Sequence, residues 1–157
     1  MNPSGAVAQM LDDEHRASLE LVNRIEPLLA RRDDAALAAL APALARALEH
    51  ETDRHFGFEE RELFPRLAEA GDGDLAALLT EEHETLRAVA ADLLPLLRGG
   101  AAAAGQGDAE ALRRLAAEWC ERVVAHVQKE TAALLPLLAD LLDEATDGEL
   151  ALAYASA

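Results

Sequence analysis

Apolar residues recur every three or four positions along most of the chain, which is the spacing of one face of an α-helix. Three breaks interrupt this pattern. They are the charged run Arg31-Arg32-Asp33-Asp34, the turn Gly71-Asp72-Gly73-Asp74 and the glycine–alanine linker Gly99–Gly107. Each break offers aspartates that can cap the helix that follows, and Asp108 is the expected cap after the linker.

The segments between these breaks are long enough to be long helices. The pattern predicts helices at about residues 5–31, 34–69, 74–98 and 108–145. Because short connections join long helices, we expect an all-α fold, an up-down-up-down four-helix bundle that forms a single domain over residues 1–157. The tail after Thr146 carries no clear pattern.

Composition and charge exclude several classes of function. The chain has 30 acidic and 14 basic residues, a formal charge of −16, which repels nucleic acid and anionic membrane surfaces. The longest uncharged run, Ala35–Ala45, is too short to span a bilayer. Met1–Gln9 has neither the basic nor the apolar region of a signal peptide, so we expect a cytoplasmic protein.

Cys120 is the single cysteine, which excludes an internal disulfide and a thiolate metal cluster. Its place in the helical pattern favours a small buried hydrophobic residue over a redox group.

An internal repeat relates the two halves of the chain. The pair Glu14-His15 recurs as Glu82-His83, and a Pro-Leu-Leu follows each histidine at the same distance. A second, slightly longer offset relates a His-x-x-x-Glu pair in each half, His55 with Glu59 and His126 with Glu130. The chain therefore contains two matched helical hairpins, each with one histidine on its first helix and a His–Glu pair on its second.

These polar side chains are expected to meet inside the bundle. Residues four apart lie on one helix face, and apolar residues such as Leu11, Leu19, Leu79 and Leu86 share the histidine faces. Buried carboxylates without a counter-charge are costly, and a pair of metal ions removes that cost. We therefore predict two metal ions, each held by two histidines, bridged by both glutamates and by an oxo or hydroxo group. The predicted ligands are His15, His55, Glu59, His83, His126 and Glu130.

Other polar residues receive plainer interpretations. His50 lies about 140° from His55 around the helix and is expected outside the metal site. Glu60 and Glu62 are interpreted as a solvated stripe. The carboxylates of Glu14, Glu51 and Glu82 fit two roles equally well, acceptors for imidazole N–H groups or surface charges.

The ordered set of motifs resembles the hemerythrin-like, or HHE cation-binding, domain family. The resemblance rests on His55-Phe56-Gly57-Phe58-Glu59-Glu60-Arg61-Glu62-Leu63-Phe64-Pro65, on Glu81-Glu82-His83-Glu84-Thr85-Leu86-Arg87, on His126-Val127-Gln128-Lys129-Glu130, and on the position of His15. It implies that the two metals are non-haem iron. Oxygen-carrying members place a second histidine four residues after the first on the third helix, whereas this chain has Arg87 there.

The four-histidine, two-glutamate set is similar to the branch linked to nitric oxide response and iron–sulfur repair and to iron-sensing relatives. The repair proteins commonly carry a cysteine-bearing N-terminal segment, whereas Cys120 is the only cysteine here. The expected function is reaction with, or sensing of, nitric oxide, oxygen or peroxide. The alternatives are reversible oxygen binding or storage, and an iron- or oxygen-sensing regulatory domain without catalysis.

Overall fold

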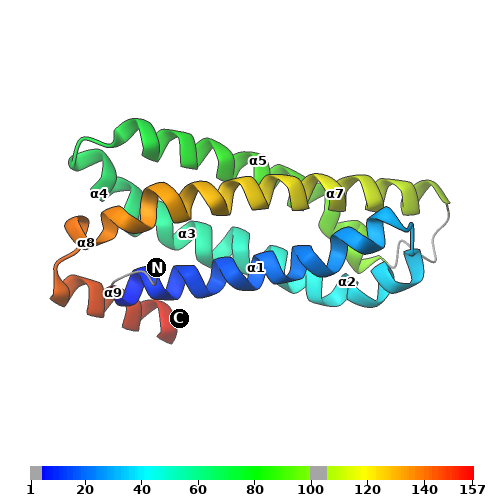
Figure 1. The fold of residues 1–157 in the computed structure, drawn as a ribbon, viewed down its shortest axis with the longest axis horizontal. Helices are drawn as coiled ribbons and strands as arrows, with labels where there is room; N and C mark the ends of the chain where they lie inside the picture. The colour runs from blue at the N-terminus through cyan, green and yellow to red at the C-terminus, as the bar shows by residue number, and fades with distance from the viewer. Residues whose placement is uncertain (1–4, 100–105) are drawn as a thin grey trace.

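The structure is a computed structural model that describes residues 5–99 and 106–157. These residues are almost entirely helical and contain no strand, which confirms the predicted all-α class for the described part of the chain. The long helices are α1 (Ala6–Ala30), α2 (Asp34–Glu49), α5 (Gly73–Arg98) and α7 (Gln106–Lys129). They lie side by side along the length of the molecule, and each runs opposite to the one before it (Figure 1).

Two of the long helical stretches change their winding as they pass the middle of the molecule. After α2 the chain continues through η1 (His50–His55), α3 (Phe56–Phe58), η2 (Glu59–Leu63) and α4 (Phe64–Glu69). After α7 it continues through η3 (Glu130–Leu134), η4 (Leu135–Leu137) and α8 (Leu138–Leu141). The segments η1, η2 and η3 are π-helical, and η4 is a 3₁₀-helix.

The π-helical segments η2 and η3 begin at repeat-related glutamates, so the backbone follows the same repeat as the side chains. The amide of Phe64 donates to the carbonyl of Glu59, and that of Leu135 donates to Glu130, five residues back in each case. A proline follows at once, Pro65 or Pro136. Because proline has no N–H and clashes with the carbonyl four residues before it, the wider turn lets both helices continue.

The helix ends agree with the sequence pattern except near the C-terminus. The fourth stretch ends at Leu141 and not at 145, because Leu142 is extended (φ −119°, ψ 123°). Asp143 then caps a further helix, α9 (Glu144–Ser156), in the tail where no pattern was evident. Helix α7 begins at Gln106, so Asp108 lies in its first turn and is not its cap. The predicted Gly99–Gly107 linker includes residues 100–105, which lie outside the described part.

The helices contact one another in a closed ring. Helix α1 contacts α2 and α7, and α5 contacts the same two helices from the other side. Helix α9 folds back along the N-terminal half of α1 (Figure 1). Short turns make this arrangement: Asp33 accepts a hydrogen bond from the amide of Ala36 at 3.1 Å to start α2, and Gly71 adopts φ +98° between α4 and α5.

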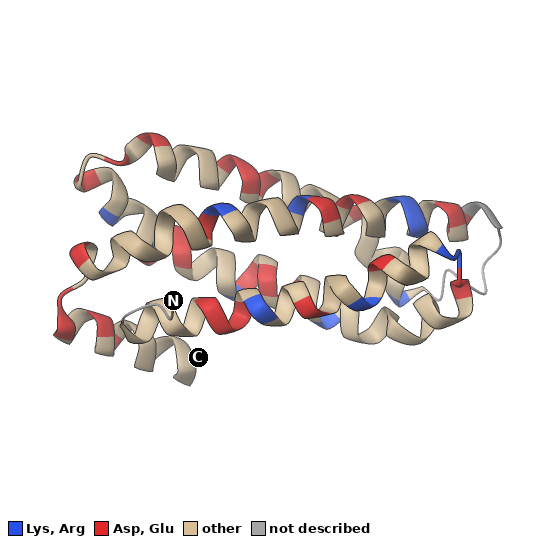
Figure 2. Cartoon of the chain, viewed as in Figure 1, with Lys and Arg blue, Asp and Glu red and all other residues tan. Residues whose placement is uncertain are grey.

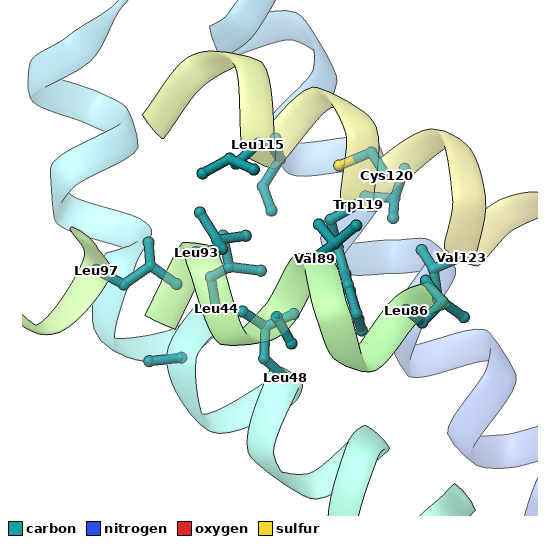
Figure 3. Close-up of a cluster of buried hydrophobic side chains, with 14 of the residues drawn as sticks. Leu44, Leu48, Leu86, Val89, Leu93, Leu97, Leu115, Trp119, Cys120 and Val123 are labelled. Atoms are coloured by element: carbon teal, nitrogen blue, oxygen red, sulfur yellow. The ribbon is translucent and has the colours of Figure 1, made fainter. Parts of the chain in front are cut away.

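The core consists of two separate hydrophobic clusters. The larger cluster lies between α1, α2, α5 and α7 and includes Leu44, Leu48, Val89, Leu93 and Trp119 (Figure 3). The smaller cluster lies toward the other end and includes Val7, Leu11, Leu63, Leu67 and Leu134. The stretch between the two clusters is therefore the part of the interior that holds polar side chains.

Acidic residues lie on every long helix (Figure 2), and over the whole chain the 30 acidic residues outnumber the 14 basic ones. Among the helices that the structure describes, none combines the length and apolar character needed to cross a bilayer.

Cys120 belongs to the larger cluster and is 2 % exposed (Figure 3). Burial and the nearby charge of Glu26 raise the pKa of its thiol to about 12.

The thiolate of Cys120 is its reactive form, so we expect iodoacetamide at pH 8 to leave the folded protein unmodified and to label it fully after unfolding in guanidinium. Mass spectrometry measures this. Complete labelling of the folded chain within minutes would contradict this placement of Cys120.

Candidate metal centre

The six predicted ligands come from four different helical stretches and meet in the interior. His15 lies on α1, His83 on α5 and His126 on α7. His55 is the last residue of η1, and the two glutamates are the first residues of π-helical segments, Glu59 of η2 and Glu130 of η3. All six side chains are buried, with at most 2 % of their surface exposed. The winding of the backbone thus changes at three of the six residues, His55, Glu59 and Glu130.

These residues fill the gap between the two hydrophobic clusters. Along α1, His15 lies between Leu11 of the smaller cluster and Val22 of the larger one. Along α5, His83 lies in the same way between Leu79 and Leu86. His15 and His83 are therefore flanked by apolar side chains on both sides along their helices, and burial in such surroundings strengthens the electrostatic interactions at the centre.

The inward-facing atoms form two overlapping groups that share both glutamates. One group comprises His15, His55, Glu59 and Glu130, and the other comprises Glu59, His83, His126 and Glu130. Within each group, one ligand atom from every residue lies within 4.8 Å of the others. The Nε2 atom of His83 is 3.2 Å from Glu59 Oε1, and the Nε2 atom of His126 is 3.3 Å from Glu130 Oε2.

Several of these buried atoms have no hydrogen-bond partner among the described residues. They are Nε2 of His55, both carboxylate oxygens of Glu59, and Oε2 of Glu130. Unpartnered polar atoms are rare inside proteins because each costs free energy that water would otherwise supply. A set of nitrogen and carboxylate oxygen donors without partners, aimed at a common point, fits a metal cation. The residues present therefore fit the predicted metal.

The outward nitrogen of every imidazole is held by a separate side chain. Nδ1 of His55 lies 3.0 Å from Glu14 Oε1, and Nδ1 of His126 lies 2.8 Å from Glu82 Oε1. Nδ1 of His83 lies 2.7 Å from Glu60 Oε2, and Nδ1 of His15 lies 3.1 Å from Thr131 Oγ1. An acceptor at Nδ1 places the proton there and leaves the Nε2 lone pair free to bind a metal.

These outer partners follow the internal repeat. Glu14 and Glu82 are repeat counterparts, and they serve two histidines that are also counterparts of each other. Glu60 and Thr131 each follow a bridging glutamate directly, so they too are counterparts. The repeat breaks at this last pair, since a carboxylate in one half is matched by a neutral hydroxyl in the other. The two groups therefore have the same types of inward-facing residue, but the histidines of one group contact two outer carboxylates and those of the other contact only one.

The structure decides between the interpretations of the remaining polar residues. Glu14 and Glu82 are imidazole acceptors, whereas the buried Glu51 accepts a hydrogen bond from Ser18 Oγ at 3.2 Å. The interpretation of Glu60 as a solvated side chain was wrong, because it binds both His83 and Arg87. His50 lies outside both groups and contacts Glu14.

Sequence reasoning missed Thr131 and Tyr154, whose hydroxyl reaches Glu14. The offset that relates the two His-x-x-x-Glu pairs also relates Glu60 to Thr131, so recognising Glu60 as an imidazole partner would have pointed to Thr131.

The carboxylates and imidazoles shift each other's pKa strongly. Burial lowers the pKa of His83, but Glu130 and Glu59 outweigh it and raise the pKa to about 9. Burial likewise lowers the pKa of His55, and the charges of Glu51 and Glu59 raise it well above its ordinary value. Burial raises the pKa of Glu130, whereas His126 and His15 hold it well below its ordinary value. Without a metal, protons on His55, His83 and His126 therefore balance the buried carboxylates.

The raised pKa of His83 predicts how the stability of the metal-free protein depends on pH. Its folded pKa lies near 9 and its unfolded pKa near 6.5, so its contribution is complete below pH 6.5 and disappears as the pH rises through 9. We expect the melting temperature in the presence of a chelator to fall between pH 6.5 and 9.5, by about 2–4 °C per kcal/mol lost.

Metal ligation needs neutral imidazoles, so the stabilisation by added metal should grow over the same pH range. Thermal unfolding followed by circular dichroism, with and without metal, measures both trends. A metal-free melting temperature that stays constant or rises with pH would show that the imidazoles do not titrate against Glu59 and Glu130.

Comparison with known proteins supports the same interpretation of the site. The family described as "Hemerythrin HHE cation binding domain" matches residues 6–138, a range that includes all six inward-facing residues. Searches of the curated proteins and of the solved structures return no match. The family match covers most of the chain, and the buried histidine and glutamate groups fit a metal-binding protein. The chain therefore belongs to the hemerythrin HHE cation-binding domain family.

Proposed function

We propose that this protein is a hemerythrin-like di-iron protein, built on an up-down-up-down four-helix bundle, that reacts with or senses a small ligand. One iron would be held by His15 and His55 and the other by His83 and His126, with Glu59 and Glu130 bridging them together with an oxo or hydroxo group. The observation that carries this proposal is the pair of four-residue groups that share both glutamates. A single metal site would not need two carboxylates common to two sets of histidines.

Iron fits the chemistry of the donors. Mixed imidazole and carboxylate ligands suit iron, manganese and zinc more than the soft metals that prefer thiolates. Glu59 and Glu130 together carry two negative charges in a buried space, which two iron cations would balance. Membership of the hemerythrin family adds the preference for iron over the other two metals.

When bound, the two irons would supply electrons and open positions for a diatomic or peroxide ligand. The chain's own residues hold the imidazoles in one orientation through their Nδ1 contacts and exclude water with the two hydrophobic clusters. A groove of about 320 Å³ between α5 and α7, lined by Glu82, Thr85, Arg122 and His126, reaches the outer side of the group that contains His83 and His126.

Arg87 supports reaction or sensing over reversible oxygen storage. Its guanidinium donates to Glu60 at 2.7 and 2.9 Å and to the carbonyl of Thr52 at 3.1 Å, so it is turned away from the inner ligands. Each iron would therefore have two histidines, without the extra histidine that makes the oxygen carriers of the family asymmetric. Assignment to nitric oxide response or iron–sulfur repair rests on family resemblance alone, as does an iron-sensing regulatory role.

Iron stoichiometry tests the shared-glutamate arrangement. We expect the anaerobically reconstituted chain to bind two ferrous ions and Glu59→Ala to weaken both, by more than the about 10–100-fold that loss of an outer partner costs. Glu62→Ala is the matched control, because Glu62 lies in the same π-helical segment but is 36 % exposed and pairs with Arg66. Loss of only one iron in Glu59→Ala, or equal loss in Glu62→Ala, would contradict the bridging role.

Exposure of the ferrous-loaded protein to oxygen separates reaction from storage. We expect one-way oxygen consumption with no oxygen released under vacuum. Each iron would have only two histidines, so the pair would lack the asymmetry that lets the oxygen carriers of the family release oxygen. An oxygen electrode and visible spectra recorded before and after evacuation measure this. Reversible uptake over several cycles would instead support the storage alternative.

A further inference from the structure

Helix α9 lies beyond the residues that match the family, and it is docked on α1 at two points. Asp147 accepts hydrogen bonds from the first amides of α1, Ala6 at 2.7 Å and Val7 at 3.0 Å. Tyr154 lies seven residues later, on the same face of α9, and contacts Glu14 farther along α1. The two helices thus run in the same direction, and the second contact point coincides with the edge of the metal centre.

The Tyr154 hydroxyl reaches both oxygens of the Glu14 carboxylate. It lies 2.7 Å from Oε1 and 2.9 Å from Oε2. The ring is fixed by an edge contact with Phe58 at 5.0 Å and by the Arg54 guanidinium 4.7 Å from its centre. Arg54 also donates a hydrogen bond to the Tyr154 carbonyl at 2.5 Å. Neighbours on two sides therefore hold this hydroxyl in place.

Glu14 links Tyr154 to His55, one of the predicted metal ligands. Its Oε1 atom, which accepts from Tyr154, also accepts from Nδ1 of His55 at 3.0 Å. In the group that contains His15 and His55, Glu14 is the one carboxylate that contacts an Nδ1 atom, because Nδ1 of His15 contacts the hydroxyl of Thr131. In the other group each outer carboxylate is held by a cation, Glu60 by Arg87 and Glu82 by Lys129. Glu14 is held instead by the Tyr154 hydroxyl and by His50.

We propose that Tyr154 is a positioning residue for the metal centre, whose O–H fixes the Glu14 carboxylate and through it the orientation and donor strength of His55. This inference rests on the proposed function. A glutamate side chain has several rotamers of similar energy, and a donor that spans both oxygens selects one of them. The same hydrogen bond withdraws some charge from the carboxylate, which alone would make His55 a weaker electron donor, so the hydroxyl supports ferrous binding through the orientation of Glu14 and His55, which outweighs this opposing effect.

The test compares Tyr154→Phe with the wild-type chain. Phenylalanine keeps the ring, and with it the contacts to Phe58 and Arg54, while removing only the hydroxyl. We expect ferrous affinity, measured anaerobically against a competing chelator, to fall about threefold to tenfold, which is less than the about 10–100-fold expected for Glu14→Ala. In the proton NMR spectrum of the ferrous protein, the Nδ1–H resonance of His55 should shift while those of His83 and His126 stay in place.

Leu150→Ala is the matched control on the same helix. Leu150 packs against the smaller cluster and has no polar group that could bind Glu14, so its truncation should lower the melting temperature and leave the His55 resonance and the ferrous affinity unchanged. An equal affinity loss in Leu150→Ala would show that Tyr154 acts only by packing α9. An unchanged affinity and spectrum in Tyr154→Phe would overturn this inference alone. A wild-type chain that binds no iron would overturn the proposed function as well.

Discussion

The burial of two carboxylates, Glu59 and Glu130, is the constraint on which the rest of this structure depends. Neither side chain has any exposed surface, and three of their four oxygens have no hydrogen-bond partner among the described residues. Such charges are tolerated inside a protein only beside positive charge. Four imidazoles surround them, and either protons on His55, His83 and His126 or bound metal cations supply that charge. Every other feature of the centre acts on these imidazoles.

The side chains that contact the Nδ1 atoms decide whether the imidazoles can bind a metal. An acceptor at each Nδ1 keeps the proton on the outer nitrogen, so the inner nitrogen faces the glutamates as a lone pair when the imidazole is neutral. The acceptors differ between the halves, with Glu60 in one and Thr131 in the other. The residue that holds Glu60 is Arg87, and its repeat counterpart is the apolar Leu19. Glu60 and Arg87 come from different halves of the chain and meet at the group of His83 and His126, so the basic residue serves the group that has the extra acid, which gives Arg87 a physical role outside the inner ligands.

The backbone contributes a further, less visible part of the arrangement. Each bridging glutamate begins a π-helical segment, and each segment is followed by a proline at the same spacing. The wider turn accommodates the ring of Pro65 or Pro136 and leaves the helix running beyond it, so the smaller cluster can close the end of the bundle. A regular α-helix through the same residues would meet the clash between each proline and the carbonyl four residues before it.

The sequence by itself determined the helical class and the six inward-facing residues. Helix periodicity is a local property, and the two repeat offsets make His15, His55, His83 and His126 stand out from His50. The tertiary structure alone decided which polar side chains hold the imidazoles. Glu60 and Glu62 look alike in the sequence, but only Glu60 meets His83. The two residues are 23 positions apart on different helices, so their contact depends on how those helices pack. Tyr154 reaches Glu14 across 140 residues from a helix with little amphipathic pattern. Such contacts depend on how helices dock, and docking leaves no periodic signal in the chain.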